Sequence, residues 1–226
     1  MIKARAQRSR LFFTNLVMNL IKYLLLYIFV FMFSFPVMLA QFSGGNSAVL
    51  LEPQADITAI VEMTTTKGTI TIGLYGKDAP MTVGNFLGLI KEKFYDSIIF
   101  HRIVKDFVIQ AGDDKTKNPK LQAAWGTGGK SYYGAPFKDE LNADAPSYQT
   151  GYVRGVMAMA NSGPATNTSQ FFICLTNLSL PKNYTIFGKV MSGLNVVDAI
   201  AASQQTTANS ADHIRILSIS IKKEQE

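Results

Sequence analysis

Short runs of β-branched, aromatic and other apolar residues, separated by turn-forming residues, fill most of the chain after residue 56. Residues 57–66 and 69–74 flank Lys67-Gly68 and predict a β-hairpin. Further runs predict strands at residues 98–104, 107–111, 155–160, 171–175, 184–190 and 214–221. About eight short strands with turn signals between them favour a closed antiparallel barrel or a sandwich.

Two segments carry apolar residues at helical spacing instead. The first begins near Asp78, which we expect to cap a helix that has Pro80 in its first turn. Its buried face is predicted to hold Val83, Phe86, Leu87 and Ile90. The second covers residues 194–203, after Gly193. The pattern therefore predicts a mainly β globular domain with two helices.

A long apolar stretch precedes this domain. Residues 23–40 contain 16 apolar residues among 18, and none of the 18 is charged. As a helix they would extend roughly 27 Å, close to the ~30 Å hydrocarbon core of a bilayer. We therefore expect an N-terminal hydrophobic helix within residues 1–40, acting either as an uncleaved membrane anchor or as a signal peptide that is removed. Ala40 suits the end of a signal peptide, whereas Met38 is not the small residue that such a cleavage site has.

The net positive charge of the chain is concentrated in its N-terminal segment. The chain has 22 Lys and Arg against 16 Asp and Glu, a net charge of +6, and a basic chain suggests nucleic-acid binding. Five of the basic residues precede the first acidic residue, Glu52, which leaves 17 basic and 16 acidic side chains in the rest of the chain. The near-neutral body argues against a nucleic-acid partner. The basic N-terminal segment predicts that residues 57–226 lie outside the cytoplasm, in the periplasm or at the cell exterior, either anchored to the membrane or secreted.

Two further features of composition narrow the class of protein. Residues 41–56 are Gly- and Ser-rich and then mixed, which predicts a tether. Cys174 is the only cysteine, so the chain forms no internal disulfide, and we expect this thiol to be buried and inert. The two histidines lie far from it in the sequence, a spacing that does not indicate a zinc site.

Five segments point beyond this general description. In order they read TTTKGTITIGLYGKDAPMTVGNF (64–86), FHRIVKDFVIQAGD (100–113), GTGGKSYYG (126–134), GVMAMANSGPATNTSQFFICL (155–175) and YTIFGKV (184–190). Together they resemble the cyclophilin family of peptidyl-prolyl cis-trans isomerases over residues 57–223. The resemblance implies an eight-stranded antiparallel barrel capped by two helices, with a groove on its outer face and no metal or cofactor. We expect residues 57–226 to be a monomeric isomerase domain whose partners are proline-containing polypeptides.

The implied reaction needs a hydrogen-bond donor beside an apolar pocket. Rotation about a peptide bond faces a barrier of about 18–20 kcal/mol, and a catalyst must bind the twisted amide better than either planar form. In the twisted form the prolyl nitrogen regains a lone pair, which a fixed donor stabilises while an apolar pocket holds the ring. By resemblance, Arg102 is the catalytic arginine, and Gln110 is the glutamine that orients this arginine or the substrate backbone.

The remaining groove residues also come from the resemblance. They are the pocket residues Phe107, Val108, Phe172, Leu180 and Tyr184, the second glutamine Gln170, and the backbone-binding stretch Ala160, Asn161 and Ser162. In that stretch the main chain of the asparagine pairs with the substrate residue before proline. Strand alternation alone places Phe107 and Ile109 on one face and Val108 and Gln110 on the other, so periodicity cannot bring all of them to one pocket.

Residues 178–188 (LSLPKNYTIFG) depart most from the family pattern. Many members have Trp-Leu-Asp-Gly-Lys-His here; Leu180 takes the place of the leucine and Tyr184 that of the histidine, while only Leu178 or Ser179 stands near the tryptophan position. That tryptophan is a main contact for cyclosporin, so we expect weak cyclosporin sensitivity. The altered segment also keeps a second function open, a proline-peptide-binding chaperone module with little turnover.

Other motifs lead to weaker expectations. GTGGKS (126–131) lacks the first glycine of a Walker A motif and is not followed by a helical pattern, so we expect a loop at the groove rim and not a phosphate loop. Residues 113–125 and 141–154 are longer than in compact members of the family. They are interpreted either as solvated loops, the first of them anchored by Trp125, or as a rim that influences the choice of client.

Overall fold

The computed structural model describes residues 54–203 and 213–224. The predicted leader at residues 1–40 and most of the predicted tether lie outside these ranges. The described strands are β1 (Ala59–Thr65), β2 (Gly68–Leu74), β3 (Arg102–Val104), β4 (Val108–Ala111), β5 (Val156–Met159), β6 (Phe171–Cys174), β7 (Ile186–Ser192) and β8 (Ile216–Glu224). The described helices are α2 (Pro80–Lys91), α3 (Pro146–Thr150) and α4 (Leu194–Ala201), with two 3₁₀ helices, η1 (Asp114–Lys117) and η2 (Pro119–Ala124).

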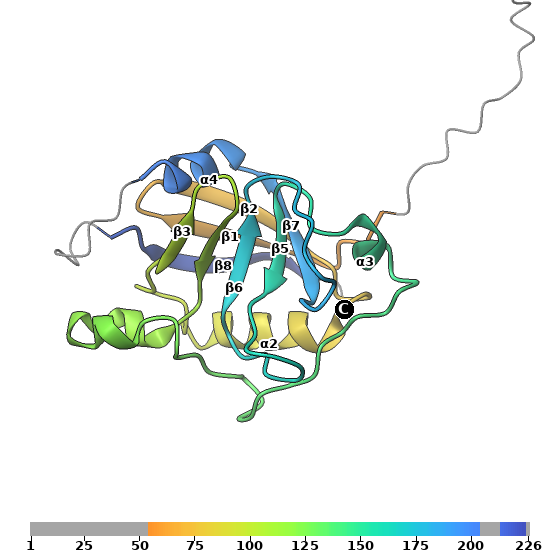
Figure 1. The fold of residues 1–226 in the computed structure, drawn as a ribbon, viewed down its shortest axis with the longest axis horizontal. Coiled ribbons are helices and arrows are strands. Elements are labelled where there is room, and N and C mark those ends of the chain that lie inside the picture. Colours follow the sequence, from red (N-terminus) through yellow and green to blue (C-terminus); the bar gives the residue numbers. More distant parts are fainter. Residues whose placement is uncertain (1–53, 204–212, 225–226) are drawn as a thin grey trace, which may run out of the picture. The chain divides into compact units, whose positions relative to one another are not determined.

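The eight strands form one sheet in the order β3-β4-β6-β5-β7-β2-β1-β8 (Figure 1). Every neighbouring pair in this order is antiparallel. Strands β1 and β2 form the predicted hairpin, with Thr65 opposite Gly68 at its turn. The structure thus has the mainly β, eight-stranded antiparallel architecture that the resemblance implies.

The chain just before β3 connects the two edges of this sheet. Ser97 N donates to Ile216 O over 2.8 Å, Ile216 N donates to Ile98 O over 2.8 Å, and Phe100 N donates to Ile214 O over 3.0 Å. The predicted strand at residues 98–104 is therefore divided: its first half lies along the start of β8, and only its second half forms β3. These bonds curl the sheet so that its first and last strands meet.

The two predicted helices lie at opposite ends of the sheet, α2 below it and α4 above it in Figure 1. Both bury apolar residues in one inner core, among them Val83, Phe86 and Ile90 from α2 and Val197 and Ile200 from α4. The prediction of only two helices was incomplete, because α3, η1 and η2 are also present. Helices of four to six residues are too short to show a helical period in the sequence.

The predicted cap of α2 was wrong. Asp78 makes no cap hydrogen bond; its Oδ2 accepts a hydrogen bond from Ser147 N over 2.8 Å, at the start of α3. Glu140 instead accepts hydrogen bonds from the free N–H groups at the start of α2. Met81 N and Thr82 N donate to its two carboxylate oxygens over 2.9 and 2.8 Å. A carboxylate at this end also complements the helix dipole. Because Glu140 comes from a distant loop, no local pattern reveals it.

Strands β5 and β6 are buried on both faces, and β4 is buried on both faces except at Gln110. Their alternating residues fall into two clusters: Ile109, Met157 and Ile173 inside the curled sheet, and Val108, Ala158 and Phe172 on its outer face. Strands covered on both sides read as continuous apolar runs, which explains why these three segments show no alternation. The outer cluster is where a pocket opens.

Candidate active site

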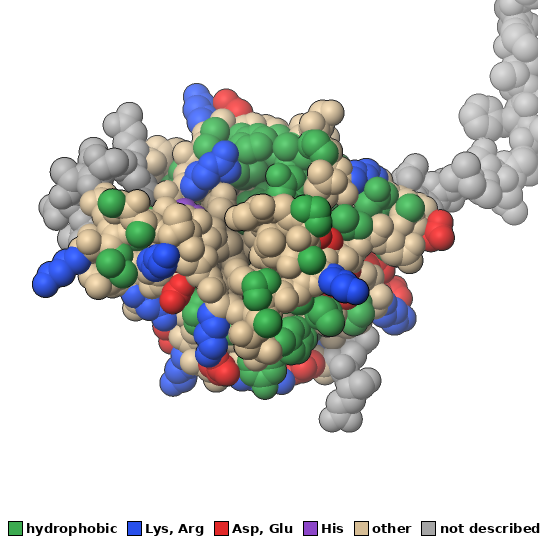
Figure 2. Space-filling model, turned by 60° about the horizontal axis from the view of Figure 1, so that its bottom comes forward, with side chains coloured by type: hydrophobic (Ala, Val, Ile, Leu, Met, Phe, Trp, Pro, Cys, Tyr) green, Lys and Arg blue, Asp and Glu red, His purple; other side chains and the backbone are tan. Residues whose placement is uncertain are grey.

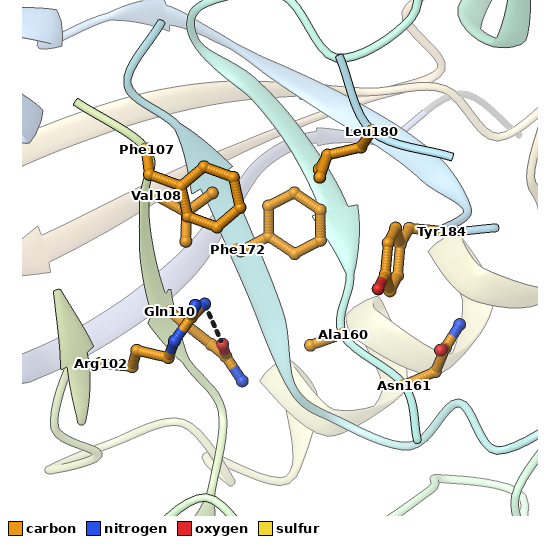
Figure 3. A pocket seen from close by; sticks show the side chains of 9 residues that line it. All are labelled: Arg102, Phe107, Val108, Gln110, Ala160, Asn161, Phe172, Leu180 and Tyr184. Atoms are coloured by element: carbon orange, nitrogen blue, oxygen red, sulfur yellow. Dashed lines mark hydrogen bonds between the residues drawn. The ribbon is translucent and has the colours of Figure 1, made fainter. Parts of the chain in front are cut away.

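The outer cluster borders a pocket of about 270 Å³ (Figure 3). The pocket combines one cation, side-chain amides and apolar rings, from Arg102, Phe107, Val108, Gln110, Ala160, Asn161, Phe172, Leu180 and Tyr184. The structure thus brings together nine of the residues assigned by resemblance. The other two, Ser162 and Gln170, are not part of this lining.

The pairing of β3, β4 and β6 aligns three pocket residues. Arg102 lies opposite Gln110 in the β3–β4 register, and Gln110 lies opposite Phe172 in the β4–β6 register. Directly opposed residues share one face of a sheet. The ladder hydrogen bonds therefore point these three side chains toward the same pocket.

Phe107 reaches the pocket because it lies outside the strand. Strand β4 begins at Val108, and Phe107 sits in the preceding turn, after Asp106, which adopts a positive φ of 58°. Alternation within β4 sends Ile109 into the inner core and leaves Val108 and Gln110 on the pocket side. Strict alternation through Phe107 would place it on the face opposite Val108 and Gln110. The turn breaks that alternation and lets all three side chains reach the pocket.

Arg102 is exposed at the edge of the pocket. Its guanidinium carbon lies 5.5 Å from the centre of the Phe107 ring, and its Nη1 donates to Gln110 Oε1 over 3.4 Å. This hydrogen bond is long, so the contact orients the guanidinium without using its full donor capacity. A permanently charged planar donor thus stands next to an apolar surface.

A chain of amide hydrogen bonds determines which atom of Gln110 faces Arg102. Gln170 Nε2 donates to Gly126 O over 3.0 Å and to Gly128 O over 2.7 Å, which leaves Gln170 Oε1 to accept from Gln110 Nε2 over 2.9 Å. Gln110 must then present its own Oε1 to the guanidinium. Gln170, which is 8% exposed, lies behind the pocket and holds this arrangement.

Asn161 uses its side chain to fix its own loop. Its Nδ2 donates to Asp139 Oδ1 over 3.1 Å and to Asn183 O over 3.0 Å. The neighbouring Ser162 is exposed, and its backbone N–H donates to Thr166 Oγ1 over 2.9 Å. Ser162 lines an adjacent pocket that also includes Asn161 and Tyr184.

Three comparisons with known proteins agree with this geometry. Residues 60–221 match the family model described as "Cyclophilin type peptidyl-prolyl cis-trans isomerase/CLD". The chain belongs to this family.

Relatives from distant organisms align with this chain over most of their own length. A peptidyl-prolyl cis-trans isomerase of Schizosaccharomyces pombe is 48% identical over 139 residues, which cover 61% of this chain and 82% of the relative. One of Arabidopsis thaliana is 40% identical over 159 residues, covering 70% and 90%. A Cryptosporidium parvum cyclophilin, solved in the presence of the dipeptide Ala-Pro, is 32% identical, with a TM-score of 0.62 and coverage of 73% of this chain and 99% of that one. These homologues are named as enzymes, the peptidyl-prolyl cis-trans isomerases.

In this cyclophilin, the altered segment 178–184 is held by Tyr152, a residue that the sequence analysis missed. Leu178 N donates to Tyr152 O over 2.9 Å, and Tyr184 N donates to the Tyr152 hydroxyl, which itself donates to Tyr184 O, both over 3.0 Å. Burial raises the pKa of Tyr152 to about 12, so its hydroxyl keeps its proton at neutral pH. The extra length of residues 141–154 was the available signal, but length alone does not say which side chain points inward.

Three more contacts support the same segment. Lys182 Nζ donates to Tyr148 O and lies 4.3 Å from the centre of the Tyr148 ring. The rings of Phe172 and Tyr184 meet edge to face, with centroids 5.6 Å apart. Helix α3 and Tyr152 therefore brace the loop that carries Leu180 and Tyr184 into the pocket.

The glycine-rich loop at residues 126–131 wraps around carboxylates. Gly126 N and Gly128 N donate to Asp113 Oδ2 over 2.5 and 3.1 Å, and Gly129 N donates to Asp114 Oδ1 over 2.9 Å. A Cβ on Gly128 would clash with Asp113 Oδ1. The N–H groups that a phosphate loop would offer to a nucleotide are thus used internally.

Metal-binding side chains are not grouped in the part of the chain that the structure describes. No three or more His, Cys, Asp or Glu residues lie together there in a way that could hold an ion. Cys174 is buried in the outer cluster, and burial raises its thiol pKa to about 12. Such a thiol is neutral at physiological pH and is a poor nucleophile.

Proposed function

We propose that this cyclophilin catalyses the cis-trans isomerisation of X-Pro bonds in polypeptides, with Arg102 as the hydrogen-bond donor. The observation that carries the proposal is the position of Arg102. It is the one cation among the described residues that line the pocket, and it stands beside apolar side chains that include Phe107, Phe172 and Leu180. Such a pocket suits the prolyl ring, and the cation suits the nitrogen of that ring.

The reaction breaks no covalent bond. The barrier comes from the double-bond character of the amide, which is lost as the bond twists and electron density returns to the prolyl nitrogen. A guanidinium N–H that meets this lone pair binds the twisted form better than either planar form. Arg102 is suited to this role because it stays charged and offers several donors in a fixed plane.

The protein supplies orientation as well as a donor. The Gln110–Gln170 chain places an acceptor against the guanidinium and so limits its rotation. Phe107 and Phe172 hold the ring, while the main chain of Asn161 pairs with the residue before proline, as in the family pattern. A donor fixed before the reaction needs no reorganisation during it.

An exchange assay on the full-length chain distinguishes catalysis of isomerisation from peptide binding without catalysis. An amount of enzyme far below the peptide concentration should accelerate exchange between the cis and trans forms of an Ala-Pro peptide, measured by NMR exchange spectroscopy. Arg102→Ala is the matched control. If the wild type accelerates exchange no more than this variant does, the enzyme proposal fails.

The second candidate is a proline-peptide-binding chaperone module with little turnover. The altered segment 178–184 favours it, because Leu180 and Tyr184 depend on a loop that departs from the family pattern. In that case, the wild type and Arg102→Ala should bind the peptide equally, and neither should change the rate of exchange.

We further propose that the clients are polypeptides folding outside the cytoplasm. The support is the N-terminal segment, with five basic residues and an uncharged apolar run at residues 23–40. The helices described in residues 54–203 and 213–224 do not include one with the length and apolar character of a membrane span. Sequencing the N-terminus of the mature protein from cells, together with protease accessibility of residues 57–226, tests both the side of the membrane and the choice between anchor and cleaved signal.

A further inference from the structure

A second pocket of about 370 Å³ adjoins the pocket that we propose holds the prolyl ring, called the proline pocket from here on. It shares Asn161 and Tyr184 with that pocket, and Figure 3 shows these two residues on the side opposite Arg102 and Phe107. Beyond them its lining includes Asp139, Leu141 and Pro164. A polypeptide bound across Asn161 would therefore meet this side pocket, defined by Asp139, Leu141 and Pro164, next.

Asp139 gives the side pocket a negative charge. Its Oδ1 accepts from Asn161 Nδ2 over 3.1 Å and from Asn167 Nδ2 over 2.8 Å, and its Oδ2 accepts from Ala165 N over 2.8 Å. All three donors are neutral, so they satisfy the carboxylate without cancelling its charge. A carboxylate has about four acceptor positions, which leaves room for one more donor.

The rest of the lining suits the stem of a long cationic side chain. Leu141, Pro164 and the Tyr184 ring are apolar, and no Lys or Arg lines the side pocket in the described part of the chain. The nearby Lys182 is directed to Tyr148 instead. Lys and Arg bury aliphatic stems against such surfaces and place the charged end near an acceptor.

We propose that the side pocket selects clients with a Lys or Arg on the amino side of the proline. The placement rests on the proposed function, in which the Asn161 main chain pairs with the residue before proline, because the side pocket begins at Asn161. The prolyl ring would occupy one pocket while a basic side chain, a few residues earlier in the client, enters the other.

A peptide series on the full-length chain tests this preference. One position at a time, from the second to the fourth residue before proline and at the same distances after it, carries Lys, Glu or Ala. We expect kcat/KM to be about three- to fivefold higher for Lys than for Glu at one amino-side position, as for a partly exposed ion pair. The preference should shrink as salt is raised.

Leu141→Trp is the informative variant because it fills the side pocket from its apolar wall. It should bring the Lys-to-Glu ratio close to one while leaving kcat/KM for the all-Ala peptide within about twofold of the wild type, a bound that allows for small indirect effects. Leu141→Ile is the matched control and should keep the preference.

The outcomes separate the two proposals. Equal rates for Lys and Glu peptides, a preference only on the carboxyl side, or a preference that survives in Leu141→Trp would overturn the side-pocket assignment. If no peptide is turned over, the isomerase proposal fails instead. In that event the Lys-to-Glu ratio of dissociation constants still decides whether the side pocket selects basic clients.

Discussion

The proline pocket has two halves that are built in different ways. One half, Arg102, Gln110 and Phe172, stands on three paired strands and is aligned by ladder hydrogen bonds. The other half, Leu180 and Tyr184, stands on a loop and depends on side-chain contacts from a distant segment.

This difference predicts which part of the site tolerates substitution. In the strand half, a shift of register would send side chains to the other face of the sheet, so its residues are constrained by the fold itself. In the loop half, the sequence departs from the family, and Tyr152 and Tyr148 supply contacts that hold the changed loop in place. We therefore expect variants of the strand half to have the larger effects.

Among the variants of the pocket walls, the largest effect should come from the strand half. Phe172→Ala removes a ring that is 6% exposed and belongs to both the pocket and the outer cluster. We expect kcat/KM to fall about 100-fold, as when a group that positions the substrate is lost, and the free energy of unfolding to fall by about 3 kcal/mol. Peptide exchange rates and urea unfolding measure the two effects.

Phe172→Leu is the control, since it keeps most of the apolar volume and should recover stability better than activity. A loss of activity in Phe172→Ala no larger than in the loop variants below would contradict the ranking of the two halves.

The changed sequence of the loop half should also make cyclosporin bind more weakly than it does to family members that have the tryptophan. Neither Leu178 nor Ser179 can replace the indole that the family places in this region, and loss of one aromatic anchor typically costs about 2 kcal/mol, or about 30-fold in affinity. Inhibition of peptide exchange by cyclosporin measures this. A nanomolar inhibition constant would refute the prediction, and Ser179→Trp should bind more tightly than the wild type.

A smaller effect is expected from Tyr152→Phe. The substitution keeps the ring but removes the hydroxyl that both accepts from Tyr184 N and donates to Tyr184 O. We expect stability to fall by about 1 kcal/mol, with kcat/KM about threefold lower for the loosened Tyr184 wall. The decrease should lie mainly in KM, because Arg102 is untouched.

Tyr148→Phe is the matched control, because the contacts of Tyr148 with Lys182 use its backbone oxygen and its ring, not its hydroxyl. Equal KM values for Tyr152→Phe and the wild type would show that the loop half does not need this brace.

The smallest effect concerns pH. Burial lowers the pKa of His101, outweighing the nearby Asp113 carboxylate, while the charge of Arg102 acts in the same direction as burial. The unfolded chain then binds a proton more readily than the folded one, so the stability that His101 contributes is present above its unfolded pKa of about 6.5 and is lost as the pH falls below it. Urea unfolding at pH 7.5 and 5.5 should show a smaller loss of stability for His101→Gln than for the wild type. An equal loss in both proteins would contradict this assignment.

Much of the fold and the strand half of the site follow from the sequence, for identifiable reasons. The β1–β2 hairpin and both long helices leave local patterns, and the segment around Arg102, Phe107 and Gln110 carries a family motif. Periodicity alone would have separated Phe107 from Gln110, since it does not reveal that a turn ends between Phe107 and β4.

The features that the sequence did not predict depend on distant contacts. Glu140 satisfies the start of α2, and Tyr152 holds both ends of the loop at 178–184. The Glu140 carboxylate and the Tyr152 hydroxyl bond to backbone groups far away along the chain, and the Tyr152 backbone oxygen accepts from Leu178 N. No spacing rule within a single segment encodes such a pair.

The central claim is that Arg102 stabilises the twisted amide and is not simply part of a peptide-binding surface. The direct test measures both kcat/KM and the dissociation constant of one Ala-Pro peptide for the full-length chain and for Arg102→Ala. We predict a loss of about 100- to 1,000-fold in kcat/KM, as for removal of a preorganised donor, with a dissociation constant that stays nearly the same. Equal losses in catalysis and binding, or no loss in catalysis, would contradict the account.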